Sequence, residues 1–224
     1  QAAHDWILVL DADELFVYPH MDWIKQKQLE EYLDGQGAEA LHSLFLEMFS
    51  REPIGAAAYR AGDDLRAAAP WFDPEGYVKK KYHRVFAGEA PDFIYMGGTR
   101  GRVFQTEFGC SKYPFFKYSP GFFLRRGLHT VEGARIAPEQ AAILHFKYLQ
   151  DFKDKAFREA RRGVYWNASA EYKAYAARFE REGDFTLWHP GARRYESWRQ
   201  LADLGLMASS PGLETFSASR RSPT

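Results

Sequence analysis

The residues of this sequence best suited to chemistry are the closely spaced acids of Asp11-Ala12-Asp13-Glu14. Residues two apart in an extended chain point to the same side, so Asp11 and Asp13 can present two carboxylates to one point. They follow the apolar run 6–10, which is typical of a strand buried on both faces of a mostly parallel sheet. Open α/β sheets bind ligands beyond such strand ends, and hard oxygen ligands suit Mg²⁺ or Mn²⁺ bridging a diphosphate. The alternative is an aspartate that caps the next helix beside a solvated neighbour.

Two histidines are candidates to complete such a metal set. His145 precedes a predicted helix and is followed two residues later by Lys147. One imidazole nitrogen could join the two carboxylates, and the Lys147 ammonium could meet a phosphate as a point charge. His129, in Gly127-Leu128-His129-Thr130, is the second candidate. For either histidine the alternative is a hydrogen-bonded core residue.

A third group of candidates is basic. The segment 97–102 is glycine-rich and contains Arg100 and Arg102. It could line a phosphate or sugar site, although it lacks the glycine and lysine spacing of a P-loop. Lys112 could play the same part. The alternative for all three cations is a solvated turn.

Composition limits the classes of protein that fit. The chain has 224 residues, of which 46% are hydrophobic and 27% charged, as in an ordinary soluble domain. Its 17% aromatic content fits either a carbohydrate cleft or an aromatic core. Thirty basic side chains balance thirty acidic ones, so no overall field attracts nucleic acid. Cys110 is the sole cysteine, which favours a reducing compartment. No apolar run approaches the ~20 residues of a membrane helix.

The elements that must position these residues follow from periodicity and turn residues. We predict strands at 6–10, 40–49 and 82–87, a loop-rich stretch at 50–91, and helices at 22–33, 152–164 and 171–182. Between 97 and 146 we expect strands without a long helix. Residues 208–224 are rich in Ser, Pro and Arg, so we predict a disordered tail there. The first residue is not Met and a strand follows at once, so we expect a piece of a longer protein.

Several segments together resemble one family, the bacterial "family 2-like" glycosyltransferases of the GT-A type. The resembling segments are DWILVLDADELFVYP, LHSLFLEMFSREPI, GGTRGRVF, SKYPFFKY, AILHFKYLQDF and RRYESWRQLADLGLM, in order over residues 5–207. One block departs from the pattern, because the family's usual ending of the second segment is nearer to DMYS than to Glu47-Met48-Phe49-Ser50.

This resemblance implies a GT-A-like α/β fold, a mixed sheet flanked by helices with further helices at the C-terminus. Residues 1–207 would be a partial domain, lacking the first βα units that hold the nucleotide base, and inactive alone. The implied reaction moves a sugar from a nucleotide-sugar to a hydroxyl of a glycan or other acceptor. Asp11, Asp13, His145 and, less directly, His129 become ligands of Mn²⁺ or Mg²⁺. The cytoplasm is the implied location, or a peripheral place at the inner membrane.

The charge that grows on the leaving diphosphate would be stabilised by the metal and by a cation, with Lys147 or Arg102 available. The acceptor hydroxyl needs a general base, and the sequence does not choose among Glu14, Asp92 and Glu107. Two other classes of protein remain open. A haloacid-dehalogenase-like phosphatase also places D-x-D after a buried strand, and a non-catalytic carbohydrate-binding module fits the aromatic content.

Overall fold

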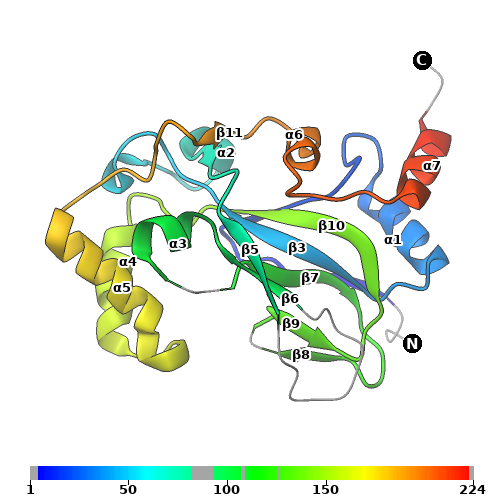
Figure 1. The fold of residues 1–224 in the computed structure, drawn as a ribbon, viewed down its shortest axis with the longest axis horizontal. Coiled ribbons are helices and arrows are strands. Elements are labelled where there is room, and N and C mark those ends of the chain that lie inside the picture. The colour runs from blue at the N-terminus through cyan, green and yellow to red at the C-terminus, as the bar shows by residue number, and fades with distance from the viewer. Residues whose placement is uncertain (1–4, 82–92, 107–108, 126, 222–224) are drawn as a thin grey trace.

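A computed structural model describes residues 5–81, 93–106, 109–125 and 127–221. Its centre is a mixed five-stranded sheet with the order β1-β7-β3-β10-β2, flanked by helices (Figure 1). The strands are β1 (Trp6–Leu8), β7 (Ser111–Lys117), β3 (Ala40–Glu47), β10 (Ile136–His145) and β2 (Glu14–Val17). The neighbours β3 and β10 are parallel, whereas the other three pairings are antiparallel. This is the mixed α/β architecture that the sequence predicts.

The strand at 6–10 differs from its prediction. Within the described residues β1 is three residues long and pairs only with β7, so it lies at an edge of the sheet. Ile7 and Val9 are each 39% exposed, instead of buried on both faces. An uninterrupted apolar run cannot distinguish a central strand from an edge strand, because the number of neighbouring strands depends on the tertiary fold and not on the run itself. The central strand is β3, in which all eight residues are buried.

The predicted helices are present with shifted ends. Helix α1 (Gln26–Gly35) begins later than predicted, because the Gln28 side chain accepts a hydrogen bond from the Lys25 backbone N–H and caps the first turn. Helices α4 (Phe152–Arg162) and α5 (Trp166–Glu182) form one end of the molecule (Figure 1). Gly163 ends α4 in the left-handed conformation that glycine favours.

The stretch from 50 to 81 is loop-rich, as predicted, and contains short elements only. These are η2 (Ile54–Ala56), α2 (Leu65–Ala68), β4 (Trp71–Phe72) and β5 (Tyr77–Lys81). The predicted strand at 82–87 lies outside the described residues. Between 93 and 145 the described chain adds β6 (Phe93–Gly97), the seven-residue helix α3 (Gly98–Phe104), β8 (Phe123–Arg125) and β9 (Thr130–Glu132) besides β7 and β10. Beyond α5 follow β11 (Arg193–Arg194), which pairs with β4, and α6 (Trp198–Asp203).

The prediction of a disordered tail at 208–224 is wrong for its described part, because residues 211–220 form helix α7 (Pro211–Arg220). The Ser210 hydroxyl caps this helix by accepting from the Leu213 backbone N–H at 3.2 Å. Leu213 is fully buried in the cluster that holds α1 residues such as Leu29. A serine cap, a following proline and one well-placed leucine therefore order a segment of low overall hydrophobicity.

The aromatic content serves mainly the core. Most of the largest fully buried side chains are aromatic, among them Tyr113, Tyr148, Tyr175, Phe49, Phe72, Phe115, Phe146 and Phe152. The cluster between α3, α4 and α5 is rich in such rings, as in the edge-to-face pair Phe104–Tyr175 with centroids 4.4 Å apart. This packing fixes the helical end against the carboxyl ends of β3 and β10, where the candidate site lies.

Candidate functional site

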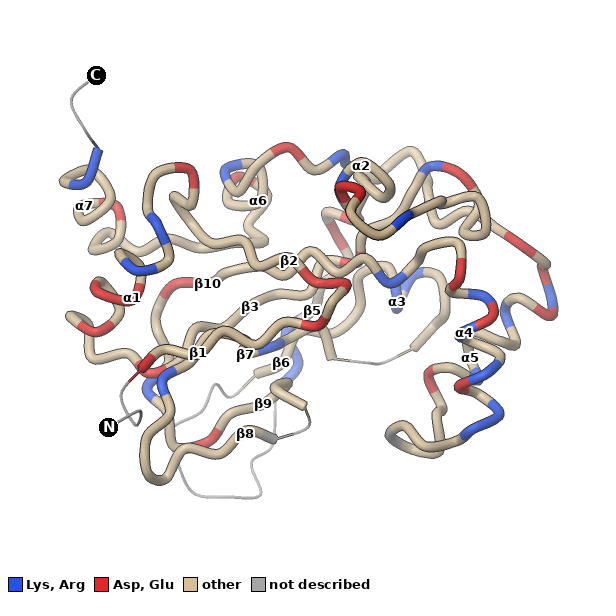
Figure 2. The backbone as a smooth tube through the Cα atoms, turned by 180° about the vertical axis from the view of Figure 1, so that it is seen from behind, with Lys and Arg blue, Asp and Glu red and all other residues tan. Residues whose placement is uncertain are grey.

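The D-x-D segment forms a turn between β1 and β2, an acidic stretch of the backbone in Figure 2. The Glu14 backbone N–H donates to the Asp11 carbonyl oxygen at 3.1 Å. The Asp11 backbone N–H donates in return to Glu14 Oε2 at 3.1 Å. Because the chain turns here, the alternation expected of extended residues does not apply, and the contacts of the two aspartates differ. The prediction that both carboxylates follow a central parallel strand and address one point is therefore corrected.

Asp11 and Glu14 share one cation, Lys112. The Lys112 Nζ atom lies 3.1 Å from Asp11 Oδ2 and 2.6 Å from Glu14 Oε2. The side chains of Lys112 and Glu14 are 4% and 1% exposed, whereas that of Asp11 is 72% exposed. Burial raises the pKa of Glu14, although hydrogen bonding to Lys112 acts in the opposite direction. Lys112 is thus neither on a solvated turn nor open to a phosphate, but compensates a buried carboxylate.

Asp13 is the acid that meets His145. His145 Nε2 lies 3.6 Å from Asp13 Oδ2, and two ligands with bonds of ~2.1 Å to one ion can lie this far apart. The Phe146 backbone N–H donates to the Asp13 carbonyl oxygen at 2.8 Å, which holds the turn against the end of β10. Burial opposes ionisation, but the interaction with His145 holds the pKa of Asp13 well below its usual range. A partly exposed, ionised carboxylate therefore stands beside an imidazole at the end of the parallel pair.

Behind His145 lies the carboxylate of Glu47. These two residues end neighbouring parallel strands and are register partners, and His145 Nδ1 lies 3.0 Å from Glu47 Oε2. Glu47 Oε1 accepts from the guanidinium of Arg100. Burial opposes the charge of Glu47, but Arg100 first and His145 second lower its pKa to about 2. The charge of Glu47 in turn raises the pKa of His145 against the effect of burial.

The other predicted cations lie deeper in the same network or outside it. Arg100 Nη1 lies 3.2 Å from Glu171 Oε1, and Lys147 Nζ lies 3.1 Å from the same oxygen. Arg100 and Lys147 are both buried, so Arg100 is not on a solvated turn. Both cations compensate the partly buried Glu171, and Arg100 also compensates the buried Glu47. Arg102 binds Asp73 in a two-pronged ion pair at 2.9 and 3.2 Å, outside this network.

His129 is a hydrogen-bonded histidine packed near the site. Its Nδ1 lies 2.7 Å from the Ser111 carbonyl oxygen, and its ring centroid lies 5.7 Å from that of Phe45. Burial lowers the pKa of His129. The His145 ring contacts Phe45 as well, with centroids 5.0 Å apart. The structure records an acidic contact for His145 but none for His129 among the described residues.

Two acids of the ion-pair network behind the candidate site, Glu47 and Glu171, are missing from the sequence-based set. Glu47 stands out as the charged residue in the otherwise apolar stretch 44–49, and a charge in a buried strand needs a partner. That signal was available in the sequence. Glu171 lies on the helix α5, where its spacing resembles that of a solvated charge, and only the packing of α5 against α3 reveals its role.

The pair Asp13–His145 fits a divalent cation in ligand chemistry, since Mn²⁺ accepts carboxylate and imidazole ligands. Among the described residues no three histidine, cysteine or acidic groups gather as a metal site. Two protein ligands suit a cation that completes its shell with water and substrate phosphate oxygens, as Mg²⁺ commonly does. Asp11 does not join them in this structure, because its carboxylate faces Lys112.

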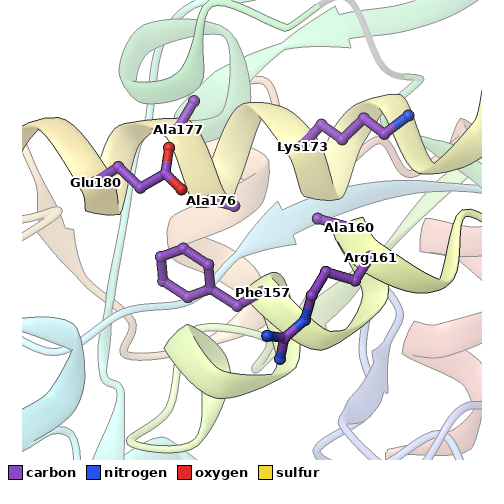
Figure 3. A pocket seen from close by; sticks show the side chains of 7 residues that line it. All are labelled: Phe157, Ala160, Arg161, Lys173, Ala176, Ala177 and Glu180. Carbon is purple, nitrogen blue, oxygen red and sulfur yellow. The ribbon is translucent and has the colours of Figure 1, made fainter.

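A shallow groove lies elsewhere, between α4 and α5 (Figure 3). Its lining residues are Phe157, Ala160, Arg161, Lys173, Ala176, Ala177 and Glu180. None of the candidate site residues lines it, and its walls mix Phe157 and alanines with charged side chains of the two helices.

No protein-family model, curated protein or solved structure matches this chain. The fold is accordingly described only as an α/β fold in which helices flank a mixed sheet. Within the described ranges no helix has both the length and the apolarity to cross a bilayer.

Proposed function

We propose that this protein is a GT-A-type glycosyltransferase that moves a sugar from a nucleotide-sugar to an acceptor hydroxyl. The observation that carries the proposal is the placement of the ionised, partly exposed Asp13 against His145, at the carboxyl ends of the parallel strands β3 and β10. Open α/β sheets bind their ligands at such ends. The family resemblance over residues 5–207 supports the same function. We propose the cytoplasm as the location of the protein.

Asp13 and His145 are the residues that would hold Mn²⁺ or Mg²⁺. The bound cation would supply positive charge to the leaving diphosphate. In the reaction the acceptor oxygen forms a bond to the anomeric carbon while the bond from that carbon to the diphosphate oxygen breaks. Arg100 and Lys147 lie behind the site, where their charges compensate those of Glu47 and Glu171.

The acceptor proton must pass to a base. Of the three sequence candidates, Glu14 is excluded in this structure by its burial against Lys112. Asp92 and Glu107 lie outside the described residues. The proposal therefore names no general base.

One contact favours a second candidate, a phosphatase with an aspartate nucleophile. The exposed Asp11 carboxylate lies 3.1 Å from Lys112 Nζ, and this chemistry pairs a nucleophilic Asp with a lysine. Against it, Lys112 lies closer to the buried Glu14 than to Asp11. Release of inorganic phosphate from a phosphomonoester would support the phosphatase. Sugar binding unchanged by EDTA would instead support a carbohydrate-binding module.

The proposal is tested in the full natural protein by release of nucleoside diphosphate from nucleotide-sugars, with and without EDTA. We expect release to require Mn²⁺ or Mg²⁺ and to fall at least a hundredfold in Asp13→Asn, about the loss when one group that stabilises transition-state charge is removed. The exposed Asp203→Asn is the matched control and should retain release. Full release in EDTA, or in Asp13→Asn, contradicts the metal-dependent mechanism.

A further inference from the structure

We infer that Glu47 is the positioning residue of the site, and that it fixes His145 in the tautomer that carries its proton on Nδ1 and directs Nε2 towards Asp13. The inference concerns a residue absent from the sequence-based site. It rests on the hydrogen-bonding geometry around His145 and does not require glycosyl transfer.

The backbone fixes the two side chains relative to each other. Glu47 and His145 are the last residues of the parallel strands β3 and β10, and the ladder pairs them directly. Directly paired residues project to the same face of a sheet. Both side chains are largely buried, at 1% and 10% exposure. The contact between Glu47 Oε2 and His145 Nδ1 at 3.0 Å is therefore set by strand register and does not depend on a mobile surface chain.

The two oxygens of Glu47 have different partners. Oε1 accepts from Arg100, and Oε2 faces His145. An ionised carboxylate only accepts hydrogen bonds. An unprotonated Nδ1 would place its lone pair against the Oε2 lone pairs, so the contact requires a proton on Nδ1. Arg100 Nη2 also lies near Nδ1, but at 3.4 Å it is the weaker partner.

The consequence falls on the other ring nitrogen. Both ring nitrogens face a carboxylate, but Nδ1 lies 3.0 Å from Glu47 Oε2 whereas Nε2 lies 3.6 Å from Asp13 Oδ2, so the shorter contact decides where the single proton of the neutral ring lies. With that proton on Nδ1, the ring offers the Nε2 lone pair at the side of Asp13. A lone pair there can bind a cation, whereas a proton there cannot. Carboxylates that orient a ligating histidine in this way commonly affect metal affinity 10- to 100-fold.

The substitution Glu47→Gln makes a directional test. Arg100 donates only, so it should attract the single amide oxygen of the glutamine. The amide NH₂ then faces His145 Nδ1, which must accept, and the ring proton moves to Nε2. The matched control is Glu171→Gln, which removes another carboxylate, 19% exposed, from Arg100 without a contact to His145.

The tautomer is read from ¹⁵N chemical shifts of the His145 ring in metal-free protein, at a pH that is raised until these shifts show the ring to be neutral. The His145 signals are assigned by their loss in His145→Gln. We expect the Nδ1–H form in the wild type and in Glu171→Gln, and the Nε2–H form in Glu47→Gln. Titration with Mn²⁺, followed by electron paramagnetic resonance, should show at least tenfold weaker binding in Glu47→Gln than in Glu171→Gln.

An Nε2–H tautomer in the wild-type protein overturns the inference, and this result needs no variant to fold. So does an unchanged Nδ1–H tautomer in folded Glu47→Gln, or the same switch in Glu171→Gln. Because the tautomer is read without metal or turnover, this arm tests the inference separately from the proposed glycosyl transfer.

Discussion

The ammonium of Lys112 and the carboxylate of Glu14 form a buried ion pair, with Nζ 2.6 Å from Oε2 and side chains 4% and 1% exposed. The pair joins the start of β7 to the start of β2, and so ties the two strands that lie on opposite sides of β3 and β10. It lies directly beneath the turn that carries the D-x-D acids.

Removing the cation of this pair should destabilise the fold. We expect Lys112→Met to lower the free energy of unfolding by about 3–5 kcal/mol, because Glu14 is left as an unpaired buried charge. Urea denaturation measures the change. The double variant Glu14→Gln, Lys112→Met should recover much of it. Lys117→Met is the control, since its partner Asp34 is 44% exposed and such pairs contribute about 0–1 kcal/mol. Equal losses in the two single variants would contradict the argument.

Stability should fall on acidification. The pKa values of Glu47 and Glu171 are lowered from 4.5 to about 2 in the folded protein, against the effect of burial, chiefly by the charge of Arg100. The unfolded chain therefore binds protons first, so the stabilisation is complete above the unfolded pKa and is lost as pH falls from about 4.5 towards 2. Urea denaturation across this range should show a steep decline that is shallower in Glu171→Gln. The exposed Glu52→Gln should follow the wild-type curve, and a flat wild-type curve would refute the prediction.

Helix α7 should contribute measurably to stability. The Leu213 side chain has no solvent exposure and packs within the core cluster that includes Leu29. We therefore expect Leu213→Ala to lower the free energy of unfolding by about 2–5 kcal/mol. For a chain of this size that corresponds to a Tm lower by roughly 4–20 °C. Thr215→Ala, on the exposed side of the helix, should leave the Tm nearly unchanged. A deletion of 209–224 without loss of Tm would restore the interpretation of this segment as an undocked tail.

The two aspartates of the D-x-D segment should differ in metal binding. Asp13→Asn should weaken Mn²⁺ binding at least tenfold, because an amide is a poor ligand for a hard cation. Asp11→Asn should change it about threefold or less, since the Asp11 carboxylate already faces Lys112. Isothermal titration with Mn²⁺ measures both. Equal losses would mean that the turn rearranges when the cation binds, so that both aspartates become ligands.

Local pattern was enough to predict much of the fold. Strand β3 and helices α4 and α5 follow from apolar runs and four-residue spacing, because burial of one face imprints a period on the sequence. The same reasoning was wrong for the strand at 6–10 and for 208–224. In both cases burial depends on which other segment of the protein packs against the residues. Such a contact produces no periodic pattern in the segment itself.

For the candidate site, the sequence by itself determined the kinds of side chain and their places at strand ends: Asp13 after one apolar run and His145 at the end of another. Tertiary structure alone decided their partners. Lys112 meets Glu14, and His145 meets Glu47, each across 98 residues of chain. Such pairs depend on strand order and register, because these determine which residues that are distant in the sequence lie close together in space. The physical reason is that a buried charge is stabilised by whichever opposite charge the fold brings within a few ångströms.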